Sequence, residues 1–430
     1  MKLKSLLTLF VFICIGMSTA QAQRTILHAG TLIDGESNTA RNEVSIIVEN
    51  DKIVSIENGY AKGNKNDTVV DLKNKTVLPG LIDLHVHLEG ETSPTKYLDG
   101  FTMNDADVAY KALHYLDETL MAGFTSVRDL GGSGVNISMR NAIKAGSIKG
   151  PRVFTAGKGI GTTGGHADPT NGVKKELMGD PGPKQGVING AAEARKAVRQ
   201  RYKDGADLIK ITATGGVLSV AKSGDAPQFF TDELEAIIET ANDYGMHVAA
   251  HAHGAEGMKR AVEAGVTTIE HGTNMTEEVM DLMIEKGAYF VPTISAGKWV
   301  AEKAKIDGYY PPLVVPKALD IGPRIQATFA RAYKRGVKIA FGTDAGVFPH
   351  GLNGREFRYM VEVGMPEMEA IKSATITAAT VLDMQDSIGS IKAGKYADII
   401  AVDKNPLNDI SAMENVSFIM KNGVVYTDSH

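Results

Sequence analysis

The sequence predicts an α/β fold, a (β/α)8 TIM barrel with a small β-sandwich domain that both termini form. Short β-type runs with turn signals occur at both ends of the chain, whereas the middle alternates apolar strands with amphipathic helices. The middle also contains eight strand candidates, the number that closes such a barrel. We therefore predict a sandwich from residues 23–78 plus 387–430, and a barrel from residues 79–386.

The first 22 residues have the pattern of a secretory signal peptide. Lys2 and Lys4 precede an apolar stretch, and small residues lead to a cleavage site near Ala22. The apolar stretch is too short to span a bilayer as a helix of the mature protein. We therefore expect a periplasmic or secreted protein that has no membrane contact after the signal is removed.

The only cysteine, Cys14, lies within this segment. The processed protein would therefore have no disulfide, no cysteine nucleophile and no thiolate metal site, so any metal must bind through histidine and oxygen. The formal net charge is −5, and the lysines and arginines are scattered. This distribution argues against a nucleic-acid partner and favours a small-molecule substrate, while a homo-oligomer stays open.

The sandwich prediction rests on strands at the two ends of the chain. Near the N-terminus, residues 45–48 and 53–56 flank a turn and form a predicted hairpin. Near the C-terminus, residues 397–402 form a strand, and residues 418–420 turn at Asn422-Gly423 into residues 424–426. One small domain built from both ends is the simplest arrangement of these strands.

The barrel prediction rests on eight apolar runs separated by helical patterns. The helix that begins at Thr231 has acidic residues in its first turn, one apolar stripe, and Gly245 at its end. Two segments, 157–188 and 297–322, are predicted to be long functional loops after strand ends. The predicted strands are 81–88, 125–130, 152–156, 208–212, 247–252, 267–271, 289–293 and 338–343.

A His-Val-His triplet ends the first barrel strand. Alternation along a strand sends His85 and His87 to the same face, so both imidazoles can point into the barrel mouth and chelate one ion. Taken alone, such a triplet is more often two core histidines that have hydrogen-bond partners than a metal site. The preceding residues 78–83, Leu-Pro-Gly-Leu-Ile-Asp, favour the metal site.

Residues 78–87 resemble the opening signature of the amidohydrolase superfamily. Later segments agree in the same order: Lys210 in Leu-Ile-Lys-Ile, His251 in Ala-His-Ala-His, His271 in Ile-Glu-His-Gly, and Asp344 in Gly-Thr-Asp-Ala-Gly. The tail 389–398 also matches, so the resemblance covers nearly the whole mature chain. Within the superfamily, the sequence is most similar to the imidazolonepropionase-like group that includes bacterial Xaa-Pro dipeptidases of the prolidase type.

The resemblance implies two divalent metal ions, for which zinc is the expected identity, although manganese or cobalt also suits such ligands. It further implies that Lys210 is N6-carboxylated and bridges the ions. An interior lysine should have a lowered pKa, and a neutral amine can add carbon dioxide; a buried lysine paired with an acid is the alternative. The predicted metal ligands are His85, His87, Lys210, His251, His271 and Asp344.

Asp344 is also the predicted catalytic residue, because a carboxylate there can take a proton from the attacking water and deliver it to the leaving amine. His166, His253 and Arg355 are the predicted substrate-binding residues. His166 could instead be an ordinary loop residue. His247 is expected to be structural, and neighbouring Arg128 and Asp129 are expected to form an internal ion pair.

The predicted function is hydrolysis of an amide or peptide bond by a hydroxide that bridges the two metals. A dipeptidase that acts on Xaa-Pro or related dipeptides is the leading hypothesis. The same site could serve a cyclic or aryl amide, as in imidazolonepropionase-like relatives. A noncatalytic periplasmic binding protein is a third alternative, which would be marked by a lost ligand, and the sequence has lost none.

Overall fold

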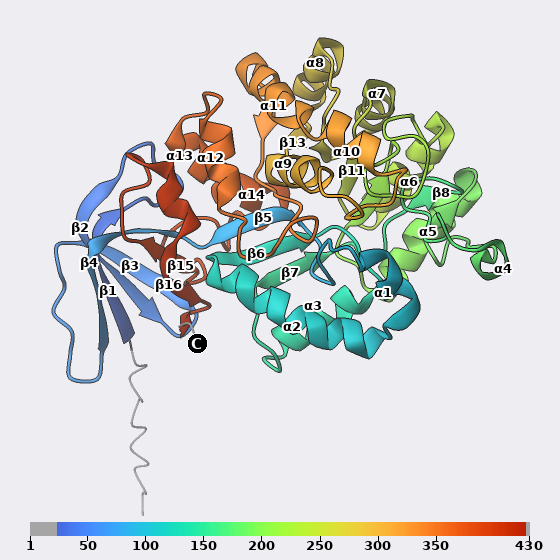
Figure 1. Ribbon diagram of the computed structural model, residues 1–430. Helices are drawn as coiled ribbons and strands as arrows, with labels where there is room; N and C mark the ends of the chain where they lie inside the picture. The colour runs from blue at the N-terminus through green and yellow to red at the C-terminus, as the bar shows by residue number, and fades with distance from the viewer. Residues whose placement is uncertain (1–23, 427–430) are drawn as a thin grey trace, which may run out of the picture.

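The computed structural model describes residues 24–426. The predicted signal peptide, residues 1–22, lies outside this range. A β-sheet domain lies at one end of the molecule and the larger barrel domain at the other (Figure 1). No helix in the described part of the chain is long and apolar enough to cross a membrane.

The sheet domain combines both ends of the chain, as predicted. Its seven strands have the order β17-β16-β15-β4-β1-β2-β3. The two ends meet where β4 and β15 pair antiparallel, with Val77 opposite Ala401. The strands are β1 (Arg24–Leu32), β2 (Arg41–Glu49), β3 (Lys52–Asn58), β4 (Thr68–Pro79), β15 (Ile399–Val402), β16 (Val416–Lys421) and β17 (Val424–Tyr426).

Both predicted hairpins are present in this sheet. In the first, Val48 pairs with Ile53 around a turn at Asn50, whose φ is 54°. In the second, Asn422 and Gly423 connect β16 to β17 with φ values of 49° and 75°. The two turns touch, because a Cβ on Gly423 would lie only 1.8 Å from the Asn50 carbonyl oxygen. Only glycine therefore fits at residue 423.

The barrel contains all eight predicted strands. They form two parallel runs, β5-β6-β7 and β10-β11-β12-β13-β14. Backbone bonds close the ring, from Thr212 N to Ile160 O at 3.0 Å and from Leu84 N to Phe341 O at 3.0 Å. The strands are β5 (Leu81–Val86), β6 (Phe124–Asp129), β7 (Arg152–Thr155), β10 (Ile209–Thr212), β11 (Val248–Ala252), β12 (Thr268–His271), β13 (Tyr289–Val291) and β14 (Lys338–Ile339).

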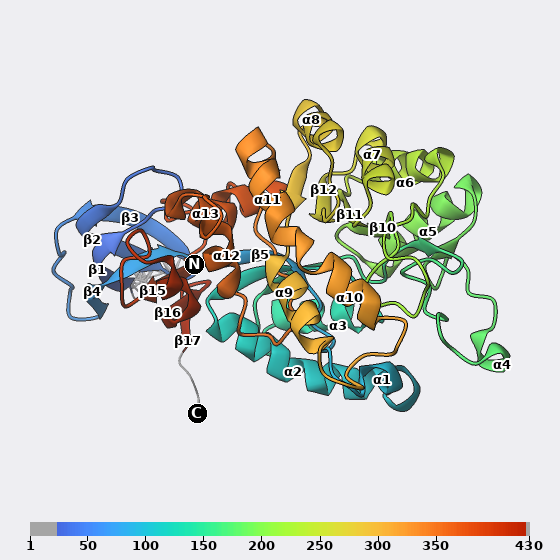
Figure 2. The same ribbon diagram turned by 45° about the horizontal axis from the view of Figure 1, so that its top comes forward.

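Helices surround the barrel strands (Figures 1 and 2). The helix predicted from Thr231 is α6, and it packs its apolar stripe inward. The helices are α1 (Lys96–Thr102), α2 (Asp105–Met121), α3 (Val135–Lys144), α4 (Lys175–Met178), α5 (Ala191–Asp204), α6 (Thr231–Asp243), α7 (Ala255–Ala264), α8 (Glu277–Lys286), α9 (Ile294–Lys303), α10 (Val315–Ile321), α11 (Arg324–Arg335), α12 (Arg355–Val361), α13 (Glu367–Ser373) and α14 (Ile376–Val381), with the 3-10 helix η1 (Ile410–Glu414).

One loop prediction is wrong. Segment 297–322 is mostly helical, since it contains most of α9 and all of α10 (Figure 2). Its glycines mark a close helix contact, because a Cβ on Gly297 would lie 2.9 Å from the Gly322 carbonyl oxygen. Segment 157–188 is largely irregular, with the short paired strands β8 (Gly161–Thr162) and β9 (Val187–Ile188) and the helix α4.

Candidate metal centre and active site

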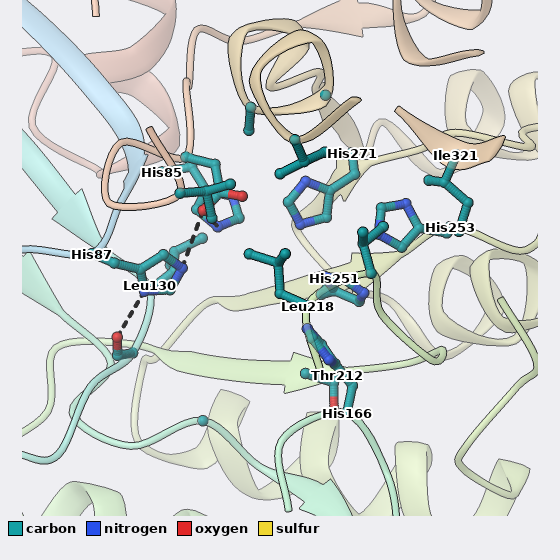
Figure 3. Close-up of a pocket in the computed structure, with 18 of the residues that line it drawn as sticks. His85, His87, Leu130, His166, Thr212, Leu218, His251, His253, His271 and Ile321 are labelled. Carbon is teal, nitrogen blue, oxygen red and sulfur yellow. Dashed lines mark hydrogen bonds and ion pairs between the residues drawn. The ribbon is translucent and has the colours of Figure 1, made fainter. Parts of the chain in front are cut away.

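A cavity of about 300 Å³ opens at the C-terminal ends of the barrel strands. Its wall brings together side chains that are up to 259 positions apart in the sequence, from His85 to Asp344. Figure 3 shows the imidazoles gathered around this space. Eight of the nine predicted site residues line the cavity: His85, His87, His166, Lys210, His251, His253, His271 and Asp344.

The six imidazoles form one continuous cluster. The His85 ring centroid lies 5.4 Å from that of His87 and 5.0 Å from that of His271. His271 in turn lies 4.6 Å from His251, and His251 lies 4.4 Å from His166. Strand alternation explains the pairs at positions 85 and 87, and at 251 and 253, because residues two apart share a face.

Each predicted histidine ligand uses one ring nitrogen for a protein contact. Nδ1 of His85 lies 2.9 Å from the Glu270 carboxylate, and Nδ1 of His87 lies 2.8 Å from the Gly131 carbonyl oxygen. Nδ1 of His271 lies 2.7 Å from the Thr293 hydroxyl. These contacts leave Nε2 of the three rings for the cavity, the arrangement by which proteins fix a histidine metal ligand.

His251 has the opposite arrangement. Its Nε2 lies 3.1 Å from the Gly215 carbonyl oxygen, which leaves Nδ1 as the available nitrogen. The carbonyl can only accept, so Nε2 carries the proton and the neutral ring has its lone pair on Nδ1.

Asp344 brings an oxygen close to the first two imidazoles. Its Oδ1 lies 3.3 Å from His87 Nε2 and 3.5 Å from His85 Nε2, and no described residue gives this buried oxygen a hydrogen bond. Two atoms that are each 2.0–2.1 Å from one tetrahedral zinc ion lie about 3.3 Å apart. The spacing of these three electron-pair donors therefore fits a cation placed between them. His271 also joins this set, because its nearest nitrogen lies within 4.8 Å of the ligand atoms of His85 and Asp344.

The charge states of three imidazoles and of the Asp344 carboxylate suit a divalent cation. Burial holds the pKa values of His85, His251 and His271 well below their usual value, so these rings are neutral at pH 7. Burial opposes ionisation of Asp344, but the imidazoles of His85 and His87 keep its pKa below the usual range. Burial likewise lowers the pKa of His87, and the Asp344 carboxylate more than offsets it, so that pKa is raised.

Lys210 lies on β10 at the floor of the cavity. Its Nζ is 3.4 Å from His85 Nε2, and within residues 24–426 it forms no salt bridge with a carboxylate. Burial lowers the pKa of Lys210 to about 8. The alternative of a lysine paired with an acid therefore loses its support, and about half of the amine is neutral near pH 8.

The backbone is strained at the site. His271, Thr293 and Asp344 have φ values of 71°, 54° and 62°, in the left-handed region that side chains rarely adopt. Strain of this kind costs about 1–3 kcal/mol per residue and is concentrated at functional sites. Here the left-handed backbone turns His271 and Asp344 toward the cavity, together with the Thr293 hydroxyl that contacts His271.

His166 and His253 lie beyond the candidate ligands. The His166 ring fits against Gly216, where a Cβ would lie 2.3 Å from ring atoms, and its buried Nδ1 has no partner among the described residues. Nδ1 of His253 lies 2.7 Å from the Thr273 hydroxyl. Burial lowers the pKa of both rings to about 3, so both are neutral groups facing the cavity.

The structure does not bring Arg355 into the cavity wall. It begins α12, after the chain has turned away from Asp344, and a role for it in substrate binding stays a prediction.

The predicted pair of Arg128 and Asp129 is wrong, because strand neighbours point to opposite faces. Arg128 instead pairs with Glu270 at 2.8 Å. Sequence reasoning missed Glu270, and its place directly before His271 was the available signal.

One wall of the cavity is apolar. Among residues 24–426, the ionisable side chains that line the cavity, apart from the imidazoles, are Lys210 and Asp344, and no arginine or glutamate of this range does so. A substrate group that extends from the candidate ligands toward α9 and α10 therefore meets hydrocarbon. The aliphatic residues of this wall are Val217, Leu218, Val300, Ile321, Ile325 and Val347.

Comparison with known proteins agrees with this geometry. The profile of the amidohydrolase family matches residues 76–426. The chain belongs to the amidohydrolase family. A crystal structure of a Xaa-Pro dipeptidase with methionine bound in its active site is 54% identical, with a TM-score of 0.92, over 94% of this chain and all of that one.

Two curated relatives are more distant. Ochratoxinase from Aspergillus niger is 33% identical over 95% of this chain and 88% of its own length. An imidazolonepropionase from Alkaliphilus metalliredigens is 26% identical over 89% of this chain and 90% of its own length. These findings confirm the predicted superfamily, group and fold. This amidohydrolase is thus an enzyme that hydrolyses amide or other C–N bonds.

Proposed function

We propose that this amidohydrolase is a binuclear metallodipeptidase that cleaves Xaa-Pro or related dipeptides outside the cytoplasm. The observation that carries the metal assignment is the spacing of His85 Nε2, His87 Nε2 and Asp344 Oδ1, three atoms that can each give an electron pair to one cation. The similarity to a Xaa-Pro dipeptidase over nearly the whole chain supports the substrate. The signal-peptide pattern supports export to the periplasm or medium.

In this proposal, His85, His87 and Asp344 would hold one divalent ion, and His251 and His271 would hold the other. Lys210, carboxylated on Nζ, would supply further oxygen ligands, and zinc is the expected metal. The lowered pKa of Lys210 favours carboxylation, because only the neutral amine adds carbon dioxide. When bound, such ions lower the pKa of a water molecule toward neutrality and polarise a carbonyl.

Asp344 moves the proton in the proposed reaction. Its buried carboxylate accepts a proton from the attacking water as the new C–O bond forms, and delivers it to the amine nitrogen as the C–N bond breaks. The side chain is only 9% exposed, so little bulk water competes for this proton. The neutral imidazoles of His166 and His253 contact the substrate from the far side of the cavity.

An aryl or cyclic amide is the second candidate substrate. The relationship to ochratoxinase and imidazolonepropionase supports it, and the apolar wall would accept a flat ring as readily as an aliphatic side chain. A noncatalytic binding protein is no longer an alternative, because the chain belongs to a family of hydrolases and the six predicted metal ligands line one cavity.

The substrate proposal is tested with protein lacking residues 1–22, stripped with a chelator and reloaded separately with Zn²⁺, Mn²⁺ or Co²⁺. Rates are measured on a dipeptide library beside aryl and cyclic amides. We expect metal-dependent turnover that is fastest on a dipeptide. Fast ring or aryl-amide cleavage without dipeptide turnover would instead establish the second candidate.

Two further measurements test the rest of the proposal. Native mass spectrometry should show one carbon dioxide added to the metal-loaded protein, and this addition should be absent from Lys210→Ala. Cell fractionation should place the processed chain in the periplasm or medium. An unprocessed chain in the cytoplasm would contradict the export proposal.

A further inference from the structure

We infer that Glu270 and Arg128 are positioning residues that fix the tautomer of His85, and that His85 presents Nε2 to a metal because of them. The inference rests on the metal centre of the proposed function, but not on the identity of the substrate. Neither residue lines the cavity, so neither touches the substrate.

The Glu270 carboxylate is fully buried and uses both oxygens. Oε2 lies 2.9 Å from Nδ1 of His85, and Oε1 accepts a hydrogen bond of 2.8 Å from Arg128 Nη2. The hydroxyl of Thr268 also donates to Oε1. With both oxygens occupied, the carboxylate cannot rotate away from His85.

Arg128 is anchored just as firmly within the barrel. Its exposed fraction is 0%, and Nε donates to the Leu84 carbonyl oxygen at 2.7 Å. Nη1 lies 3.5 Å from Nε2 of His247, at the opposite end of the barrel. The guanidinium on β6 therefore connects β5 and β12, the two strands that carry His85 and His271.

His85 differs from the other candidate ligands in its supporting group. His87 and His251 contact backbone carbonyls, and His271 contacts a hydroxyl. Among the four candidate histidine ligands, only His85 has a carboxylate as its supporting group, which keeps the proton on Nδ1 and strengthens Nε2 as a metal donor. Because Arg128 neutralises Glu270, this support leaves no unpaired charge in the core.

Stability alone does not explain this pair. Replacing both partners of a buried ion pair with apolar residues is often neutral or stabilising, whereas removing one partner leaves an unpaired buried charge. The ion pair by itself is therefore not required for stability of the fold. The contact with His85 is the function that such an exchange would remove.

The test uses the double variant Arg128→Met with Glu270→Leu, which removes both charges together. The matched control is Arg152→Met with Asp398→Leu, which removes an ion pair of the same type far from the cavity. Metal content is measured by mass spectrometry of the elements and metal affinity by chelator competition. We expect metal affinity to fall about 10- to 100-fold in the first variant and to be unchanged in the control.

A second variant, Arg128→Met with Glu270→Gln, restores an acceptor for His85 Nδ1 without a charge. We expect its metal affinity to lie between those of the wild type and the Leu variant. It also provides the test if the Leu variant does not fold. Wild-type affinity in either Glu270 variant would overturn the inference alone, whereas a wild-type protein that binds no divalent metal would overturn the proposed metal centre.

Discussion

The barrel mouth and the interface between the barrel and the terminal sheet both bury charged and polar groups. The two regions differ in whether these groups have partners within the protein. At the interface, Arg152 pairs with Asp398 and Asn422, and Lys421 donates to the Gly150 carbonyl oxygen at 2.6 Å. The ammonium of Lys52 lies 3.3 Å from the centre of the Tyr396 ring. The charged groups of this interface thus have partners.

The mouth leaves buried polar atoms unpaired. Nδ1 of His166, Oγ1 of Thr212 and Oδ1 of Asp344 are buried without hydrogen-bond partners among residues 24–426, and all three residues line the cavity. Buried polar groups in native proteins are normally satisfied. Six other buried atoms of residues 24–426 also lack a hydrogen-bond partner, but these three are grouped around one cavity, which indicates ligands that the protein itself does not supply. The interface stabilises the fold, whereas the mouth keeps its polar groups for chemistry.

The strongest test of this contrast is Asp344→Asn. The amide has the same shape but cannot accept and return a proton, so we expect kcat/KM to fall about 10³-fold or more. The melting temperature should stay near that of the wild type, because burial of a neutral amide costs less than burial of a carboxylate. Steady-state kinetics and thermal melts check this result, and activity within tenfold of the wild type would remove Asp344 from the proton transfer.

Substrate charge gives the next largest effect. Because the wall formed by Val217, Val300 and Ile321 offers no partner to a charge, apolar side chains should be favoured. We expect Met-Pro to exceed Glu-Pro, and Ala-Leu to exceed Ala-Glu, by about 100-fold in kcat/KM in at least one pair, which corresponds to about 2.7 kcal/mol. Equal rates within both pairs would contradict the assignment of this wall to the substrate.

The sequence predicts the mouth well because its signals are local. Strand alternation places His85 beside His87, and short motifs mark Lys210, His271 and Asp344 at strand ends. Because all barrel strands end at the same rim, the ligands can be predicted to meet even when their contacts with one another are not known.

What the sequence could not predict depends on contacts across the barrel. Glu270 and Arg128 are 142 positions apart, and no periodicity relates them. The segment 297–322 was predicted to be a loop because it is longer than a barrel connection needs, but its terminal glycines serve a close contact between α9 and the end of α10. Arg355 lies near Asp344 in the sequence but not in the cavity wall, because the intervening turn changes the direction of the chain.

Lys317 shares features with both regions. Its buried ammonium is paired, like the charged groups of the interface, but it lies beside the barrel mouth. It donates from α10 to the carbonyl oxygens of Gly216, Ser219 and Ala221 at 2.7–2.9 Å. This segment carries Val217 and Leu218 of the apolar wall. In Lys317→Met the segment loses its anchor, so we expect kcat/KM to fall about tenfold, mainly through KM.

The control for Lys317→Met is Lys305→Met, an exposed position after α9. Its kinetics should match those of the wild type. An equal fall of kcat at unchanged KM in Lys317→Met would instead place this lysine in the chemical step.

The interface should show the smallest effect on activity and a clear effect on stability. Asp398→Asn leaves Arg152 without its charged partner, and breaking a buried pair costs about 3–5 kcal/mol. Because the Arg152 side chain is 18% exposed, we expect a smaller loss, about 2 kcal/mol in the free energy of unfolding. The exposed control Asp386→Asn should be unchanged. Since every candidate ligand comes from the barrel, kcat/KM of Asp398→Asn should stay within twofold of the wild type at temperatures below the unfolding transition of the variant. A large kinetic loss in a stable variant would show that the sheet domain sets the geometry of the mouth.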